Sequence, residues 1–384
     1  MSILSRQWRY IWTTMTALVL NYQFSKRFAK EGASGRNEFI RIVNHIIIRR
    51  NGPIRKFSLH IPEEIDSFQE VDQWIMFFSR NIVRELIFTN SDQPYELLND
   101  VFSCSRLTRL HLENCIFMPP PHFEGFPNLY DLSLENVDFR ANSCGTTVSL
   151  PRLRWLTLFK CRYDFDFNIK ARNLELLVVT ACFDAILLRL MDSTPRLSMV
   201  VIYFWKAIED CVQLEGMNLT RMLSILPKLR FLTMDGHFLK VPKWLPGAIN
   251  SLSYLWLVDF QLSDLDQLHG ALCLLRNSRN LENLRMDSTK HAVMHYDVGP
   301  ASDHLESPDC LDQTLNQLRD VEITTLKGSR PELLFIKLLL AHSPSLDKMT
   351  IQSSGTIDAS KTLNIVKDVM QFPRASPKAE IIYS

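Results

Sequence analysis

The sequence of 384 residues lacks the glycine-rich motifs on which phosphate binding and many hydrolytic mechanisms depend. It has 12 glycines, and none of them forms a GxG, GxxxxGK or GxSxG pattern. Neither a phosphate-binding loop nor a nucleophile elbow is therefore expected. We predict that the protein is not an enzyme and that it uses no cofactor.

Long apolar runs and an excess of one charge are also missing. The run ILLRLM (186–191) is interrupted by Arg189 and is far shorter than the roughly 20 residues of a membrane-spanning helix. The run ALVL (17–20) is too brief for a signal peptide. With 43 basic and 42 acidic residues the formal net charge is +1, which gives no general attraction to nucleic acid or to an anionic membrane. We expect a cytoplasmic or nuclear protein with neither as a partner.

Cysteine and histidine spacing gives no metal signature. The eight cysteines form no CxxC pair, which is typical of free thiols in a reducing compartment. His291 and His295 lie four apart, a spacing that on a helix allows a shared metal ion, but the glutamate of a metalloprotease motif is missing. We interpret the polar stretch 291–309 as a loop and predict no metal site.

What the sequence does contain is an internal repeat. Four segments place apolar residues at their first, fourth and sixth positions, and usually a cysteine at the ninth: LTRLHLENC (107–115), LYDLSLENV (129–137), LRWLTLFKC (153–161) and LELLVVTAC (174–182). The same frame recurs more loosely from Ile54, Val83, Leu197, Leu229, Leu252, Leu281, Leu318 and Leu346. The spacing averages about 27 residues, inside the range of leucine-rich repeats.

This frame predicts an α/β fold, an irregular leucine-rich-repeat solenoid. The fourth and sixth residues of each repeat point inward and the third, fifth and seventh point outward, because strand side chains alternate. Stacked repeats form a parallel sheet on the concave face, with helices and turns on the convex face. We expect helical turns at 71–80 and 222–229. Cysteines at the ninth position, such as Cys115 and Cys161, are expected to be small buried groups.

The outward positions of the central repeats are unusually apolar, and the repeats on either side offer charged residues. A hydrophobic centre with a charged rim is typical of a protein-binding surface, where tryptophan and tyrosine are common anchors. The predicted target-binding residues are Trp155, Phe159, Tyr203, Phe231, Tyr254 and Trp256. Two alternatives remain: a loop or the C-terminal segment covers these side chains, or a register shift of one residue turns them inward.

Three segments resemble one protein family. SILSRQWRYIW (2–12) with the following TTMTALVLN resembles the last helix of an F-box and its exit into a repeat region. LRDVEITTLKGSRPELLFIKLLLAHSPSLDKMTI (318–351) resembles the C-terminal FBD module, and VDQWIMFFSRNIVRELIF (71–88) resembles the start of the repeats. The chain is thus similar to the plant F-box/FBD/leucine-rich-repeat proteins. We predict an F-box remnant at 1–21, repeats at 22–306 and an FBD-like module at 307–384.

The resemblance implies a substrate receptor of a Skp-cullin-F-box ubiquitin ligase, in which the F-box binds a Skp-type adaptor and the repeats bind an unknown target protein. Leu4, Trp8 and Ile11 match apolar positions of the F-box helix and are the implied adaptor contacts, unless they only cap the first repeat. An interface of about 800 Å² per partner is hard to form from a single helix. We therefore expect weak or no adaptor binding by this chain as given. The rival interpretation is a scaffold, or a truncated gene product, that binds targets without the adaptor.

Overall fold

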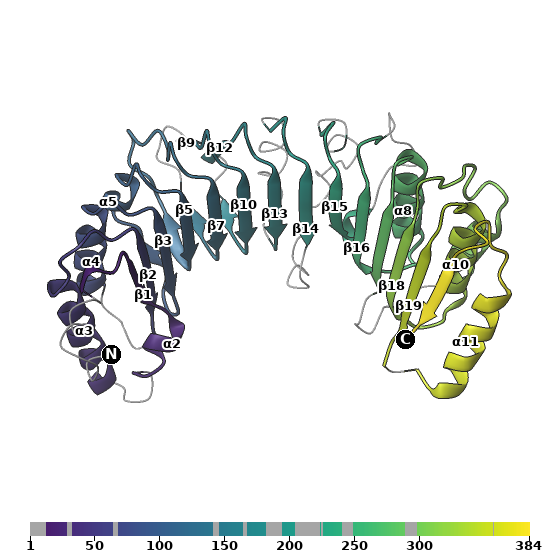
Figure 1. The fold of residues 1–384 in the computed structure, drawn as a ribbon, viewed down its shortest axis with the longest axis horizontal. Coiled ribbons are helices and arrows are strands. Elements are labelled where there is room, and N and C mark those ends of the chain that lie inside the picture. The colour runs from purple at the N-terminus through teal and green to yellow at the C-terminus, as the bar shows by residue number, and fades with distance from the viewer. Residues whose placement is uncertain are drawn as a thin grey trace. The chain divides into compact units, whose positions relative to one another are not determined.

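The computed structural model describes residues 13–28, 33–63, 68–140, 146–163, 167–181, 194–203, 223, 226–239, 249–288, 298–355 and 357–384. The chain forms two compact units, Met1–Arg196 (unit 1) and Leu197–Ser384 (unit 2), and each is described by itself. Both units contain a parallel sheet with one strand per repeat, as the leucine-rich-repeat pattern predicts (Figure 1).

The sheet of unit 1 is built from strands that pair in chain order, every neighbour being parallel. The strands are β1 (Ala17–Leu20), β2 (Lys56–Ile61), β3 (Glu85–Asn90), β5 (Arg109–Glu113), β7 (Asp131–Glu135), β10 (Trp155–Phe159) and β13 (Leu176–Thr180). The helices are α2 (Tyr22–Ser25), α3 (Ala33–Ile48), α4 (Gln69–Ser79) and α5 (Asn99–Phe102). The helix predicted at 71–80 is thereby confirmed as α4, and α3, α4 and α5 lie along one face of the sheet (Figure 1).

Unit 1 also has short side strands. They are β4 (Tyr95–Glu96), β6 (Cys115–Phe117), β8 (Asp138–Phe139) and β11 (Arg162–Tyr163) in one small sheet, and β9 (Thr146–Ser149) with β12 (Phe167–Lys170) in another. Of these, β6, β8 and β11 each follow a main strand after a sharp turn, and the turn residue is left-handed, with φ of 55° at Asn114, 50° at Asn136 and 51° at Lys160. Asparagine tolerates this conformation, and the Asn136 amide also donates to the Asn114 side chain at 2.9 Å. The turns of successive repeats are thus linked to one another.

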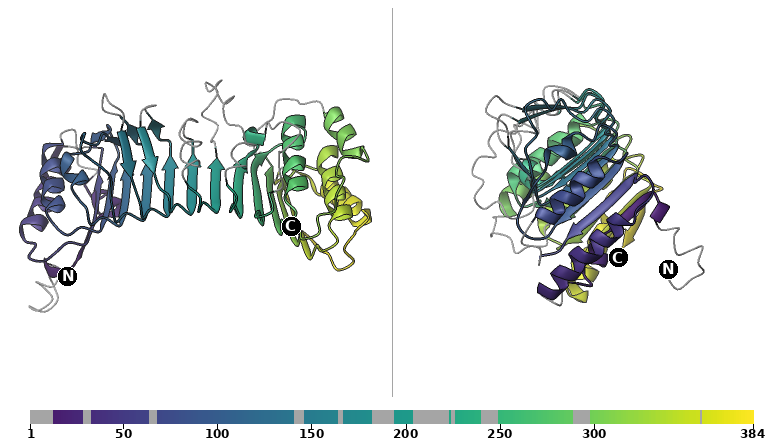
Figure 2. Two further views of the ribbon diagram at one scale, coloured as in Figure 1. Left: turned by 90° about the horizontal axis from the view of Figure 1, so that it is seen from above. Right: turned by 90° about the vertical axis from the view of Figure 1, so that its left-hand side faces the viewer.

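The sheet of unit 2 also pairs in chain order with all neighbours parallel. Its strands are β14 (Met199–Tyr203), β15 (Phe231–Asp235), β16 (Tyr254–Phe260), β17 (Asn283–Ser288), β18 (Asp320–Leu326), β19 (Lys348–Ser353) and β20 (Glu380–Tyr383). The helices are the 3₁₀ turn η2 (Gly236–Leu239), α8 (Leu265–Asn277), α9 (Val298–Glu306), α10 (Arg330–His342) and α11 (Ala359–Gln371). Figure 2 shows the strands of each unit side by side from above. The segment 318–351, which resembles the FBD module, contains β18, α10 and β19.

Local sequence explains where the helices of unit 2 begin and how closely they pack. Asp264 caps α8 by accepting hydrogen bonds from the amides of Asp266 and Gln267. At the start of α10, the Glu332 carboxylate accepts from the Ser329 amide at 2.7 Å. Gly270 allows α8 to pack closely against η2. A Cβ at this position would come within 2.2 Å of the Leu239 carbonyl oxygen.

The predicted repeat frame has the correct register. Each of the twelve predicted repeat starts lies two residues before a strand, and each start residue is buried. The inward residues of β5, Leu110 and Leu112, are fully buried. Burying a leucine side chain contributes about 1.5–3 kcal/mol, so the stacked leucines supply the core. A register shift of one residue is therefore excluded as an explanation of the outward positions.

Some expectations need correction or stay open. The segment 291–309, predicted to be a loop, contains helix α9. A helix forms here because proline is tolerated in a first helical turn, where Pro300 lies, and because Ala301 and Leu305, four residues apart, are both buried. Strands β1 and β20 were not predicted. Most of the helix expected at 222–229 and the pair His291 and His295 lie outside the described residues. The domain boundaries after 21 and 306 stay predictions.

Candidate protein-binding surfaces

The residues expected to bind a target fall on the sheet faces of both units. Trp155 and Phe159 belong to unit 1, and Tyr203, Phe231, Tyr254 and Trp256 belong to unit 2. All six occupy outward strand positions, as the frame predicts. Leu4, Trp8 and Ile11, the implied adaptor contacts, lie outside the described residues.

Unit 2 presents an aromatic surface, which we define as Met199, Tyr203, Phe231, Tyr254 and Trp256. Met199 is paired in register with Phe231, and Phe231 with Tyr254, so the three side chains are neighbours across the sheet. The rings of Phe231 and Tyr254 stack, with centroids 4.4 Å apart and an angle of 14° between their planes. The stack fixes both rings while leaving them half-buried, so part of their apolar area remains available to a partner.

Trp256 is held by polar neighbours on β17 and β18. Its indole nitrogen donates to Asp287 Oδ2 at 2.9 Å, and the Arg285 guanidinium lies 4.6 Å from its ring centroid. Arg285 in turn pairs with Asp287 and with Glu322, each at 3.3 Å, and Thr324 donates to Asp287 at 2.6 Å. These contacts satisfy the indole N–H and restrict the ring before any partner arrives.

The two tyrosines of this surface are neutral at physiological pH. Burial raises the pKa of Tyr254 and of Tyr203, and nearby carboxylates raise both further, whereas Arg285 opposes the shift at Tyr254. Their hydroxyl groups therefore stay protonated and can donate hydrogen bonds to a partner.

Two outward positions of β15 differ from the expected exposure. Thr233 is only 2% exposed and Asp235 is fully buried, although the frame places both on the sheet face. The Thr233 hydroxyl makes no hydrogen bond within the described part of the chain. The side chains of these two residues are therefore not accessible to a partner.

Unit 1 presents a smaller apolar surface, which we define as Trp155, Phe159, Leu176 and Val178. Trp155 is 41% exposed and packs edge to face against Tyr130, with ring centroids 5.7 Å apart. In the sheet register Trp155 lies beside Leu176 on one side and Asp131 on the other. The apolar surface thus adjoins charged residues on β7 and β5.

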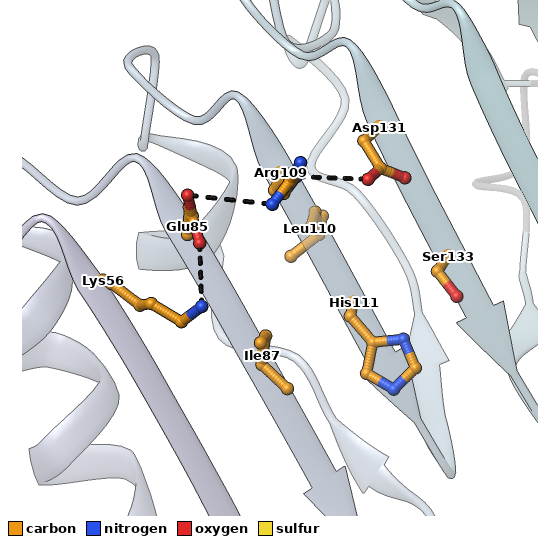
Figure 3. Close-up of a pocket in the computed structure, with 8 residues that line it drawn as sticks. All are labelled: Lys56, Glu85, Ile87, Arg109, Leu110, His111, Asp131 and Ser133. Atoms are coloured by element: carbon orange, nitrogen blue, oxygen red, sulfur yellow. Dashed lines mark ion pairs between the residues drawn. The ribbon is translucent and has the colours of Figure 1, made fainter. Parts of the chain in front are cut away.

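Those charged residues form an ion-pair row at the first outward position of four successive strands. Lys56 and Glu85 are 3.1 Å apart, Arg109 and Glu85 4.0 Å, and Arg109 and Asp131 3.2 Å (Figure 3). A pocket of about 220 Å³ opens beside this row. Because the charges alternate and pair with one another, the row is electrostatically satisfied without a partner.

The pocket floor also carries a histidine. His111 lies between Ile87 and Ser133 in the next row of the sheet (Figure 3). Burial lowers the pKa of His111, and the charges of Glu135 and Asp131 only partly oppose that shift. His111 is therefore neutral near pH 7.

A third row on the same strands is acidic. Glu113 on β5 pairs in register with Glu135 on β7, and we call these two residues the acidic pair. Burial and the neighbouring Glu135 carboxylate raise the pKa of Glu113. This row contrasts with the ion-pair row at the other end of the same strands.

Unit 2 has a second pocket, of about 510 Å³, where α8 meets α9 on the helical side. His269 and His304 line it, with their ring planes nearly perpendicular and centroids 4.4 Å apart. Arg276, also in the lining, donates to the Cys310 carbonyl and pairs with Asp312 at 3.8 Å. This pocket lies on the helical side rather than on the sheet face.

The described cysteines are structural. Cys115 and Cys161 are fully buried at the ninth repeat position, as expected, whereas Cys182 lies outside the described residues. Burial raises the pKa of Cys115, and it raises the pKa of Cys104 to about 11. Protonated, buried thiols are poor nucleophiles. No group of three or more metal-ligating side chains occurs among the described residues, and no helix there is long and apolar enough to span a bilayer.

The fold and these surfaces define the class of protein: a leucine-rich-repeat protein with aromatic side chains on its sheet faces. A family profile, the LRR repeats of the FBD-associated F-box protein At5g56370, matches residues 71–232. This match supports the resemblance of the chain to the plant F-box/FBD/leucine-rich-repeat proteins that its segments predict.

Relatives from Arabidopsis thaliana match along the whole chain. The F-box/FBD/LRR-repeat protein At1g13570 is 29% identical over 100% of this chain and 92% of its own length. The putative F-box/FBD/LRR-repeat protein At1g22000 is 24% identical over 100% of this chain and 86% of its own length. F-box/LRR relatives of this kind indicate a role in protein interaction.

Among solved structures, an internalin from Listeria monocytogenes aligns over 90% of this chain and 93% of its own, with 12% identity and a TM-score of 0.33. A similarity this low carries no statement about fold, which rests on the strands themselves and on the repeat match.

Sequence reasoning missed how the surface residues contact one another. Lys56, Glu85, Arg109 and Asp131 each stand two places after a repeat start, so the repeat frame already made them neighbours. Trp256 and Arg285 each stand four places after a repeat start, so the frame made them neighbours as well. The signal was charge alternation between equivalent positions of successive repeats, which a search within single segments does not detect.

Proposed function

We propose that the protein captures a protein target on its sheet faces, as the target-recognition subunit of a Skp-cullin-F-box ubiquitin ligase in the cytoplasm or nucleus. The observation that carries the proposal is the restrained Trp256 side chain on the aromatic surface of unit 2. Rigid, half-buried aromatic side chains are the usual anchors of protein interfaces, because little conformational entropy is lost when a partner binds them.

Target binding is tested by display selection of a random library of 12-residue peptides against the immobilised full chain. Affinities of enriched peptides are then measured for Trp256→Ala and Trp155→Ala. The matched control is Leu363→Ala on α11, a 54% exposed apolar residue on a helix. We expect at least a tenfold loss with one or both tryptophan variants, an unchanged circular dichroism spectrum and no loss with the control. Equal affinities for all variants would contradict the proposal.

The ligase connection is tested by calorimetry with a purified Skp-type adaptor. The chain is compared with a version that carries a complete F-box and with Trp8→Ala. The proposal predicts tight binding by the extended version and weak binding by the chain as given, further reduced by Trp8→Ala. If neither version binds, the protein is instead a repeat scaffold that holds targets without the adaptor.

A further inference from the structure

The acidic pair of unit 1 is unusual because two glutamates occupy register-paired positions and, in the part of the chain that the structure describes, neither has a cationic partner. Neighbouring parallel strands lie about 4.8 Å apart, and like charges directly opposite one another destabilise a sheet. In the described residues neither Glu113 nor Glu135 takes part in an ion pair. By contrast, the ion-pair row on the same strands is arranged as Lys56, Glu85, Arg109 and Asp131, with every charge paired.

The basic groups that face this region have other partners. His60, in the same row two strands away, is 2.8 Å from the Ser25 hydroxyl and 3.2 Å from the Ser91 hydroxyl, and burial lowers its pKa. His111 is neutral for the same reason. The Lys160 ammonium lies 5.0 Å from the ring centroid of Phe159, and Arg109 pairs with Glu85 and Asp131. Among the described residues, no basic group is therefore paired with either carboxylate.

The acidic pair also adjoins an apolar surface that can hold the rest of a ligand. Glu135 pairs in register with Phe159, and Trp155 lies on the same outward face of β10, four residues earlier in the chain. Leu176 and Val178 continue this face on β13. The two carboxylates suit the charged head of a lysine or arginine side chain, and the half-exposed aromatic rings beside them suit its aliphatic stem.

We propose that this face of unit 1 binds an extended segment of the protein target in which a lysine or arginine is flanked by apolar residues. The cation lies between Glu113 and Glu135, and the neighbouring apolar side chains contact Phe159 and Trp155. The inference rests on the proposed function, because it names the kind of partner that the sheet face takes. Bound cation and carboxylates neutralise each other, so binding relieves the repulsion that the free protein carries.

Two paired variants distinguish this role from a merely structural one. The double variant Glu113→Gln with Glu135→Gln removes the like charges and should raise the melting temperature of the full chain. The control Glu85→Gln removes the partner of Lys56 and Arg109 in the ion-pair row and should lower it slightly. Opposite shifts from chemically identical substitutions on adjacent strands would show that the acidic pair carries a repulsion that the ion-pair row does not.

Ligand preference is read from the display selection of random 12-residue peptides, repeated with each variant. We expect lysine or arginine beside apolar residues in peptides enriched by the unmodified chain and by Glu85→Gln. The double variant should lose this enrichment and bind those peptides at least tenfold more weakly. Enriched peptides without basic residues, or equal affinity for the double variant, would overturn the inference.

The outcomes separate this inference from the proposed function. Peptides that lose affinity with Trp256→Ala but contain no basic residue would leave the proposed function standing and refute only the acidic-pair role. Failure to enrich any peptide with the full chain would count against both.

Discussion

The contact between Trp256 and Asp287 should make a measurable contribution to stability and to binding. In a double-mutant cycle, Trp256→Phe removes the indole N–H and keeps an aromatic ring, while Asp287→Ala removes the acceptor. The cycle cancels the separate losses that Asp287→Ala causes at Thr324 and Arg285, because the same contacts are lost whether residue 256 is tryptophan or phenylalanine.

The expected magnitude follows from the geometry. A hydrogen bond to a charged group contributes about 1.5–3 kcal/mol when buried. The Asp287 side chain is 22% exposed and that of Arg285 32%, which favours the lower end of the range because solvent weakens charged contacts. We expect a coupling free energy of about 1–1.5 kcal/mol between Trp256 and Asp287. The cation–π contact of Arg285 adds about 0.5–1 kcal/mol that a phenylalanine only partly retains.

The free energies of unfolding are measured by urea unfolding of the full chain and compared among variants that share the same m-value. The affinity of an enriched peptide is a second readout. A control cycle pairs Trp256→Phe with Glu322→Ala, since Glu322 contacts Arg285 but has no hydrogen bond to the indole. That cycle should give a coupling below about 0.5 kcal/mol. If the Asp287 cycle is equally small, Asp287 does not restrain the tryptophan, and the argument for a pre-organised anchor fails.

Four further results are expected. Lys160→Asn should raise the free energy of unfolding by about 0.5–1 kcal/mol, because asparagine tolerates the left-handed turn; an unchanged urea midpoint would contradict this. Gly270→Ala should lower stability despite a gain in helix propensity of about 1 kcal/mol, since the new Cβ clashes with the Leu239 carbonyl, and a higher melting temperature would refute that packing. The pKa of Glu113 is raised in the folded state above its ordinary value of 4.5, so ionisation of this side chain lowers the free energy of unfolding as the pH rises above 4.5. Glu113→Gln should remove that loss, as measured by urea midpoints between pH 4 and pH 7. Cys104 and Cys115 should react with a thiol reagent only after urea is added, and rapid modification of the native chain would show that they are accessible.

The repeat frame predicts much of the fold because one physical rule operates at each repeat. Leucine or another apolar residue at fixed offsets must face the core, and period-two alternation then determines the outward residues. For this reason Trp155, Tyr254 and Trp256 could be placed on the sheet face from sequence alone. The strands β1 and β20 escaped detection because their short segments carry too few of the spaced leucines that mark a repeat.

Contacts between repeats were harder to predict. To predict the left-handed turn at Asn114 and its hydrogen bond with Asn136, one must know how close two backbone segments lie that are 22 residues apart in the sequence. The burial of Thr233 and Asp235 depends on the surroundings of their side chains and not on strand alternation. The role of Trp256 became clear only once the register placed Asp287 and Arg285 beside it.

We propose that target segments bind the sheet face rather than the helical side. Photocrosslinking tests this with an enriched peptide whose affinity Trp256→Ala reduces, and with p-benzoylphenylalanine placed in the full chain either at Asn283, beside Tyr254 in the sheet register, or at Leu363 on α11. We expect crosslinks from position 283 that Trp256→Ala abolishes, and none from position 363. Crosslinks from position 363 alone would contradict this proposal.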